Sequence, residues 1–405
     1  MSIPFLKIFS KNFICIHLIF QGKLNTAYFD EKFDPKTKYD DKNYIYGRYF
    51  MKKIVLFILA ICTLCGLCAC TGSMQNGDGD IHVFYYTYSD TYISSVRSSL
   101  DKALDTAGLK YRDHDGAGNQ TTQTEQIQTA ITSGAKCLLV NIVNTGSDDA
   151  AMGIVNLAKG ADIPVIFFNR EVSDEVINSY DKCAFVGTRA EEAGILQGEM
   201  IGEYLIQNYQ KVDRNGDGKI SYVLFKGEEG NNEAIYRTKY SVEEANKILS
   251  KFEKPALEFY DASNRDKYLV DKNGHWSAQS ANEYMTTILS SYNDKNKNAV
   301  ELVICNNDGM AEGAISALNA AGYNTGNENF IPVFGVDATD AAKELIKSGK
   351  MVGTIKQDAE GMAEALCTLS KNISEGKGLL EGMDKYSIDE GMNKIRIAYS
   401  KYLAQ

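Results

Sequence analysis

Beyond the first eighty residues, short apolar runs alternate with stretches whose apolar residues recur at helical spacing. The run Ile81–Tyr86 predicts a strand. The helix face that follows it is marked by Ile93, Val96, Leu100 and Leu104. Further strands are predicted at residues 137–143, 163–168, 184–186, 222–225, 257–260, 302–305 and 331–336, with helices at 150–159 and about 191–209. Strands that alternate with helices are typical of a parallel sheet covered by helices on both faces, so we predict an α/β fold.

These units are too numerous for one compact sheet, and we therefore predict two doubly wound parallel-sheet lobes joined by a hinge. The first lobe is predicted to comprise residues 80–187 with about 357–393. The second lobe is predicted to comprise residues 188–356 with about 394–405. Short strands at 353–355 and 394–396 are expected to cross back between the lobes.

The first seventy-nine residues have a different character. From Met51 a basic head precedes an apolar run that ends in Leu67-Cys68-Ala69-Cys70. This pattern predicts a lipoprotein signal at residues 51–70 with lipid attached to Cys70, and the run is too short to span a membrane. Because export machinery reads the beginning of a chain, we interpret residues 1–50 as a mis-assigned, unstructured leader; an unusually long leader is the alternative. Residues 71–79 then form a flexible tether.

The charge of the chain argues against one class of partner, and its cysteines suggest how the thiols are used. The chain has a net charge of −10, and residues 1–70 are basic on balance, so the exported part is more acidic than the whole. Such a surface argues against a nucleic-acid partner. The exported part retains four widely spaced cysteines, namely Cys137, Cys183, Cys305 and Cys367. We expect buried free thiols, with a disulfide as the alternative outside the cell.

The stretch Asp213–Ser221 has the spacing of a calcium loop. Its oxygen donors would be the side chains of Asp213, Asn215, Asp217 and Ser221 and the backbone carbonyl of Lys219. The twelfth position, where such loops carry a closing glutamate, is the apolar Leu224. The closing carboxylate must therefore come from another segment. The alternative is a solvated turn rich in Asp, Asn and Gly.

Polar residues follow the predicted strands where a parallel sheet binds ligands. These residues are Asp90, Asn169, Asn306–Asp308 and Asp337, and two loops add Arg237 and Trp276. Carboxylates and amides combined with an aromatic plate are suited to gripping a sugar. The alternative for each strand-end residue is a helix cap. Trp276, the only tryptophan, lies in a polar loop and is expected to be exposed.

Two other functional classes find little support. An enzyme would need clustered acid–base groups or a phosphate-binding loop, but His82, His114 and His275 are scattered and no such loop is present. A transcription regulator would need a DNA-reading helix pair where the lipoprotein signal lies. We therefore predict that the chain is not an enzyme.

From about residue 80 onward the chain resembles the galactose/glucose-binding proteins, which are periplasmic sugar-binding proteins of the type I fold that serve ABC transporters and chemotaxis. The resemblance is carried by Val165–Asn169, Asp213–Ser221, Val300–Asp308 and Pro332–Asp337. It implies that Glu301 closes the calcium loop. The sugar contacts that it implies are Asp90, Asn169, Arg237, Asn307 and Asp337, with Tyr92 and Trp276 as aromatic plates.

Several positions depart from the family's pattern. Asn231 and Glu233 replace a histidine and an aspartate, Gln357 replaces an asparagine, and Tyr92 replaces a phenylalanine. Ser221 is shorter than the usual glutamine, so a water would bridge it to the metal. These changes keep hydrogen-bonding groups but move them, which leaves the identity of the sugar open.

The expected function is capture of an aldohexose, galactose or glucose, by lobe closure and delivery to ABC transporter permease subunits. Calcium would be structural, and the lipid anchor would be the only membrane attachment. The alternative is a sensor that presents its closed form to a chemoreceptor.

Overall fold

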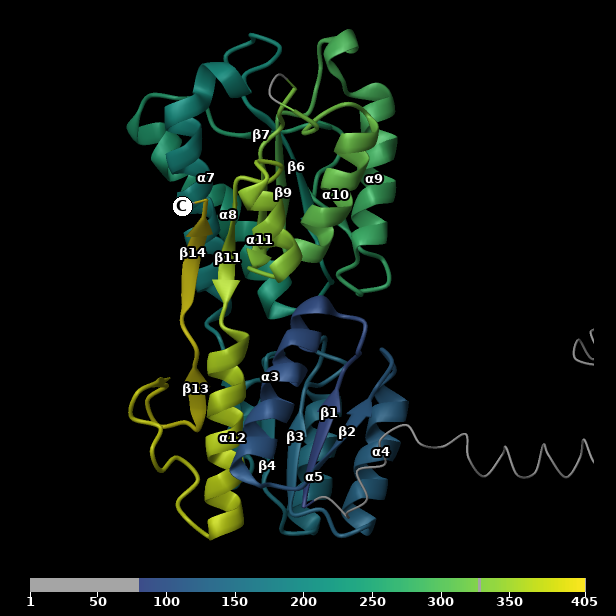
Figure 1. The fold of residues 1–405 in the computed structure, drawn as a ribbon, viewed down its shortest axis with the longest axis vertical. Coiled ribbons are helices and arrows are strands. Elements are labelled where there is room, and N and C mark those ends of the chain that lie inside the picture. The colour runs from purple at the N-terminus through teal and green to yellow at the C-terminus, as the bar shows by residue number, and fades with distance from the viewer. Residues whose placement is uncertain (1–79, 327–328, 405) are drawn as a thin grey trace, which may run out of the picture. The chain divides into compact units, whose positions relative to one another are not determined.

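The computed structural model describes residues 80–326 and 329–404 (Figure 1). The predicted leader, signal, lipid-attachment residue Cys70 and tether all lie outside the described residues. Within the described part of the chain, no helix combines the length and apolar character needed to cross a membrane.

The first lobe is built on a sheet with strand order β12-β13-β5-β4-β3-β1-β2. Its strands are β1 (Ile81–Tyr85), β2 (Tyr111–Asp115), β3 (Cys137–Val140), β4 (Val165–Phe168), β5 (Cys183–Gly187), β12 (Ser387–Ile388) and β13 (Lys394–Arg396). Its helices are α3 (Thr91–Ala107), α4 (Gln120–Thr132), α5 (Asp149–Gly160), α6 (Asp174–Asn178) and α12 (Ala359–Glu375). All pairings are parallel except that of β12 with β13. One core lies between the sheet and helices α3 and α12, and a second core lies on the opposite face.

The second lobe has the sheet order β14-β11-β10-β9-β6-β7, with β8 also paired to β6. Its strands are β6 (Ser221–Lys226), β7 (Glu258–Phe259), β8 (Leu269–Val270), β9 (Leu302–Cys305), β10 (Val333–Asp337), β11 (Gly353–Gln357) and β14 (Tyr399–Leu403). Its helices are α7 (Ala190–Val212), α8 (Asn232–Lys251), α9 (Ala278–Ser291), α10 (Asp308–Ala320) and α11 (Asp340–Lys347), with a short 3₁₀ turn, η2 (Asp294–Asn296). Only β14 runs antiparallel to its neighbour. Apolar cores again fill both faces of the sheet.

The chain passes between the sheets three times, namely after β5, after β11 and after β13 (Figure 1). Two mostly parallel sheets flanked by helices confirm the predicted fold class. The predicted boundary of the last crossing was wrong, because residues 394–396 were assigned to the second lobe. Instead, β13 pairs in parallel with β5, and its Ile395 is fully buried in the core of the first lobe. The last crossing therefore lies between Arg396 and Tyr399.

Close packing of α7 against α8 sets the position of the latter helix. Gly194, Gly198 and Gly202 line the contact at four-residue spacing. A Cβ atom at Gly194 would lie 2.5 Å from the carbonyl oxygen of Tyr236. Since only glycine leaves that space, α8 approaches closely and carries its first turn to a fixed place.

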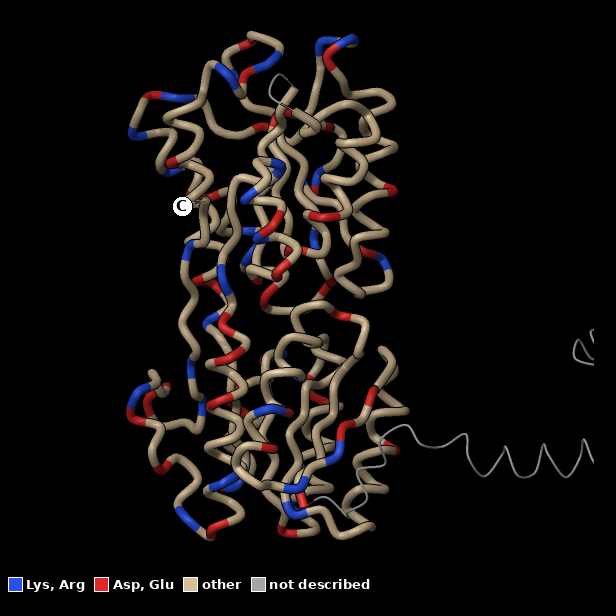
Figure 2. The backbone as a smooth tube through the Cα atoms, viewed as in Figure 1, with Lys and Arg blue, Asp and Glu red and all other residues tan. Residues whose placement is uncertain are grey.

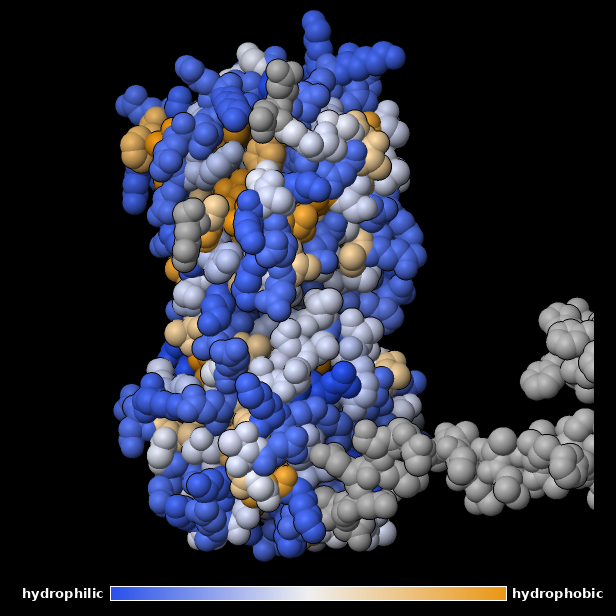
Figure 3. Space-filling view, in the orientation of Figure 1, coloured by the Kyte–Doolittle hydropathy of each residue, from blue (hydrophilic) through white to orange (hydrophobic). Residues whose placement is uncertain are grey.

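Charged residues of both signs are spread along the described chain. Figure 2 shows acidic and basic residues interspersed along the described chain, with no continuous basic block. The face in Figure 3 is mainly hydrophilic with scattered apolar residues.

Candidate functional site

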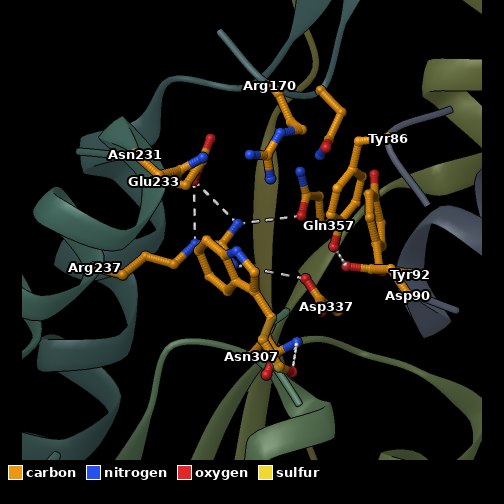
Figure 4. A pocket seen from close by; sticks show the side chains of 12 residues that line it. Tyr86, Asp90, Tyr92, Arg170, Asn231, Glu233, Arg237, Asn307, Asp337 and Gln357 are labelled. Carbon is orange, nitrogen blue, oxygen red and sulfur yellow. Dashed lines mark hydrogen bonds and ion pairs between the residues drawn. The ribbon is translucent and has the colours of Figure 1, made fainter. Parts of the chain in front are cut away.

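Twelve residues from both lobes surround one pocket of about 40 Å³ (Figure 4). The first lobe contributes Tyr86, Asp90, Tyr92, Asn169 and Arg170, and the second contributes Asn231, Glu233, Arg237, Trp276, Asn307, Asp337 and Gln357. The structure thus brings together all ten residues predicted to contact a ligand. Tyr86 and Arg170 were not predicted.

Three of the lining residues are also helix caps. Asp90 accepts a hydrogen bond from the backbone N–H of Ile93 at 2.9 Å. Asn231 and Asn307 cap α8 and α10 in the same way. The capping interpretation is therefore correct for these residues, and it accounts for their position. A cap fixes the side chain at the carboxyl end of a strand, where it also lines the pocket.

Three other lining residues have a left-handed backbone. The φ angles are 60° at Asn169, 55° at Trp276 and 124° at Asp337. Such angles are unfavourable for residues with a Cβ atom, and most of all for a bulky tryptophan. These unfavourable φ angles cluster at the pocket and set the directions of the three side chains. Such clustering of backbone strain is common at ligand sites.

Trp276 is buried, which corrects the expectation that it is exposed. Only 8% of it is accessible. Its ring lies against Gly227, where an added Cβ atom would come within 2.1 Å of the ring. The indole N–H donates to Glu228 Oε2 at 3.3 Å. The glycine provides space for the ring and the carboxylate satisfies its polar atom, so the loop can bury the tryptophan.

Arg237 is the centre of a buried network. Its Nε donates to Glu233 Oε2 at 3.1 Å, and Nη1 donates to the carbonyl oxygen of Asn306 at 2.8 Å. Nη2 donates to the Tyr399 hydroxyl at 2.8 Å and to Gln357 Oε1 at 3.2 Å. A guanidinium with so many partners has a fixed orientation beside the pocket.

Glu233 is engaged mainly by the protein. Besides Arg237, its carboxylate accepts hydrogen bonds from Thr188 Oγ1 at 2.6 Å and from the Tyr399 hydroxyl at 2.9 Å. Thr188 and Tyr399 lie next to the first and last crossings between the lobes. The longer side chain at this position therefore links the pocket to the crossing segments.

The pocket combines buried acceptors with donors that lack partners. Burial raises the pKa of Asp337 well above its usual value, against the opposing effect of Arg237. Gln357 Nε2 and Arg170 Nε are buried and have no hydrogen-bond partner among the described residues. A ligand with both donating and accepting groups would satisfy both kinds of atom, which is the chemistry of a sugar hydroxyl.

The loop predicted to bind calcium is tied to Glu301 by hydrogen bonds, while the role of Glu301 as a calcium ligand stays a prediction. Glu301 is fully buried, and its Oε1 accepts hydrogen bonds from the backbone N–H groups of Arg214 at 2.7 Å and Asn215 at 3.2 Å. Its Oε2 accepts from the backbone N–H of Ser221 at 2.9 Å. Burial raises the pKa of this carboxyl, although the loop amides oppose the shift.

The donor chemistry of this loop suits a hard cation. Asp213 accepts hydrogen bonds from the N–H groups of Gly216 and Gly218, so the turn is already wound around its carboxylate. The side-chain donors contributed by Asp213, Asn215, Asp217 and Glu301 are all oxygen atoms, as calcium requires. No group of three or more His, Cys, Asp and Glu side chains in the described residues is arranged as a metal site. The loop therefore agrees with calcium in donor type alone, and a calcium ion at this place stays a prediction.

The four cysteines of the described residues are free thiols. Cys137, Cys183 and Cys305 are buried and Cys367 is half-buried. Burial raises the pKa of the Cys137 and Cys183 thiols to about 12. These thiols are therefore protonated core residues and not reactive groups.

Comparison with known proteins places this geometry in context. A family model for the periplasmic binding protein domain matches residues 81–378. The D-galactose/methyl-galactoside binding periplasmic protein MglB of Haemophilus influenzae is 35% identical over 323 residues, covering 80% of this chain and 88% of that protein. A putative rhizopine-binding protein of Rhizobium meliloti is 28% identical, covering 72% of this chain and 83% of that protein.

Solved structures share the fold. A solute-binding protein of an ABC transporter from Clostridium phytofermentans, with bound β-D-glucose, aligns with a TM-score of 0.63 at 21% identity and covers 80% of this chain and 94% of its own. A solute-binding protein from Bacillus halodurans, with bound myo-inositol, aligns with a TM-score of 0.61 at 24% identity and covers 82% of this chain and 96% of its own. At these identities the likeness concerns the fold alone.

Proposed function

The chain belongs to the periplasmic binding protein family and is a solute-binding protein, not an enzyme, and we propose that it captures an aldohexose outside the cytoplasm for an ABC transporter. Galactose and glucose are the proposed ligands. The permease subunits of the transporter are the proposed partners.

The observation that carries this proposal is the lining of the pocket. Tyr92 and Trp276 provide aromatic faces, and carboxylates, amides and guanidinium groups surround them. Arg237 is paired with Glu233, and Arg170 is paired with Glu228. Arg237 also pairs with Asp337 at 3.7 Å, so one guanidinium faces two carboxylates. The lining thus holds three carboxyl groups, on Asp90, Glu233 and Asp337, against two guanidinium groups, on Arg170 and Arg237, which disfavours an acidic sugar and favours a neutral polyol.

Capture would proceed by closure of the lobes. Because residues from both lobes line the pocket, a sugar bound to one lobe gains further contacts only when the other lobe closes over it. Those additional contacts shift the population toward the closed form, which the permease would recognise. The same closed form would be the signal if a chemoreceptor were also a partner.

Calorimetric titration of residues 72–405 with D-galactose, D-glucose, myo-inositol and D-ribose tests the function. Micromolar or tighter binding of one hexose is expected. Asp90→Ala and Asp337→Ala should each weaken it by at least about 30-fold, since each removes a hydrogen-bonding carboxyl group from the pocket. Asp105→Ala, at an exposed position of α3 away from the pocket, serves as the control. If neither D-galactose nor D-glucose binds in this titration, the proposal is contradicted.

Two further features belong to the same proposal. The loop Asp213–Ser221, with Glu301, would bind a structural calcium ion that stabilises the second lobe. Lipid on Cys70 would hold the protein at the membrane, and mass spectrometry of the membrane fraction would test this by finding a lipid-modified cysteine at the mature N-terminus.

A further inference from the structure

The segment that follows β4 contacts the opposite lobe through Arg170. This side chain is largely buried. Its Nη2 donates to Glu228 Oε2 at 2.8 Å and Oε1 at 3.0 Å, and also to the carbonyl oxygen of Val143. Glu228 follows β6 in the second lobe, so this ion pair joins the two lobes at the edge of the pocket.

Each end of the ion pair contacts a residue that lines the sugar pocket. The Arg170 guanidinium lies over the ring of Tyr86, 4.3 Å from its centre (Figure 4), and the Tyr86 hydroxyl donates to Asp90 Oδ2 at 2.6 Å. Glu228 Oε2 also accepts the indole N–H of Trp276. A continuous set of contacts therefore runs from Asp90 in the first lobe to Trp276 in the second.

The described residues provide hydrogen-bond acceptors for only part of the Arg170 guanidinium. Its Nη2 carries the contacts to Glu228 and Val143, whereas Nε is buried in the pocket wall without a hydrogen-bond partner in the described parts of the chain. A buried donor without a partner is unfavourable. An acceptor oxygen on the ligand would complete the hydrogen bonding of the same guanidinium that joins the lobes.

Glu171, the residue after Arg170, anchors this segment to β13. Glu171 Oε1 accepts hydrogen bonds from Lys394 Nζ at 2.9 Å and Arg396 Nη2 at 2.8 Å. Arg396 Nη1 also donates to the carbonyl oxygen of Thr188, at the first crossing. Arg170 is therefore presented to Glu228 from a segment anchored to two of the three crossings, which limits the entropy lost when the pair forms.

We propose that Arg170 and Glu228 form an interlobe latch that the bound sugar completes, so that this ion pair sets how long the ligand stays in the closed site. The inference rests on the proposed function. Lobe opening separates the two side chains and hydrates them, whereas closure over a ligand excludes water and strengthens the pair. Arg170 is thus a positioning residue that couples ligand occupancy to closure.

The single tryptophan gives a direct measurement, because Trp276 contacts Glu228 and lines the pocket. Stopped-flow fluorescence with D-galactose and D-glucose would give association and dissociation rates for the wild type, Arg170→Met, Arg170→Lys, Glu228→Gln and the double variant Arg170→Met/Glu228→Gln. Glu228→Gln keeps an acceptor for the indole while removing the charge. Lys182→Met, which breaks an exposed ion pair within the first lobe, is the matched control.

We expect each single variant to raise the dissociation rate about tenfold and to change the association rate by less than about threefold. The sugar should leave the double variant at about the same rate as it leaves the faster of the two single variants, because the two residues act as one pair. Arg170→Lys should recover part of the residence time through its charge. The control should match the wild type.

Dissociation rates equal to that of the wild type, or additive effects in the double variant, would overturn the latch. A fall in the melting temperature of the ligand-free protein without a change in dissociation rate would also overturn it, because that pattern indicates a purely structural role. Should the wild type bind neither hexose, the proposed function itself fails. The latch is then measured by small-angle scattering of ligand-free protein, where Arg170→Met must have a larger radius of gyration than the wild type, and equal radii would refute it.

Discussion

Gly194 of α7 packs against the backbone of Arg237 in α8, and a Cβ atom at the glycine would lie 3.1 Å from the Arg237 Cα atom and 2.5 Å from the carbonyl oxygen of Tyr236. The position of the central guanidinium of the pocket thus depends on the absence of a side chain on a neighbouring helix.

Replacement of this glycine by alanine is expected to displace the first turn of α8. The extra methyl group meets backbone and not a flexible side-chain end, so we expect Gly194→Ala to lose about 1–3 kcal/mol of stability and to bind hexose at least tenfold more weakly. Chemical denaturation and calorimetry would measure the two effects. Gly153→Ala in α5, where nothing lies within 4 Å of the added atom, should leave binding unchanged and slightly raise stability. Unchanged hexose affinity in Gly194→Ala would contradict the argument.

Gly227 makes a similar space for the ring of Trp276. A Cβ atom there would overlap the indole, so Gly227→Ala must move the ring away from the pocket. We expect hexose binding to fall by more than tenfold and tryptophan emission to shift toward longer wavelengths as the ring becomes hydrated. Gly378→Ala, at an open site in the first lobe, is the control. Wild-type affinity combined with wild-type emission would show that the ring does not depend on this space.

Asp113 gives stability an unusual pH dependence. Burial, together with the nearby Asp101, raises its pKa to about 8. A carboxyl whose pKa is higher in the folded state favours folding at low pH, and this contribution is lost as the pH rises from about 4 to about 8. Asp113→Asn should therefore be more stable than the wild type at pH 8 by roughly 1–2 kcal/mol, with little difference at pH 4.

Denaturant titration at a series of pH values would measure this difference. Asp105→Asn, at an exposed position of α3, should follow the wild type at every pH. A difference between Asp113→Asn and the wild type that does not change with pH would show that Asp113 does not titrate in this range.

Calcium is expected to raise the melting temperature of the wild type. At one hundred times the dissociation constant, a single bound ion adds about 2.7 kcal/mol. Differential scanning fluorimetry with calcium and with a chelator would measure the effect. Glu301→Gln should lose it, and Asp217→Ala should reduce it; the latter changes an exposed loop residue and leaves the core intact. Equal melting temperatures of the wild type with calcium and with chelator would count against a calcium site.

The sequence predicted the strands of the two sheets best where they are buried on both faces. It did not predict β2, because Tyr111-Arg112-Asp113-His114-Asp115 lies at the edge of its sheet and has only one apolar residue. Helix α4 was missed for a related reason. Its fully buried face includes Gln123, whose amide donates to the carbonyl oxygen of Asn141, so its core-facing pattern is not apolar.

The pocket was predicted from residues that follow strands and from the resemblance to a family. Arg170 escaped both arguments, since a basic residue in a loop reads as a solvated side chain. Its partner Glu228 lies 58 positions later in the chain, and no local pattern relates the two. Tyr86 was missed because it extends the apolar run of β1, and its role depends on the hydroxyl that reaches Asp90.

The adjacent strands β13 and β14 contribute to different sheets, the first beside β5 and the second beside β11. The ten residues 394–403 therefore supply the last strand of each sheet along the chain. A chain that ended before Lys394 would leave β5 and β11 each without a neighbour on one side, so a single ten-residue segment covers an open edge in both sheets.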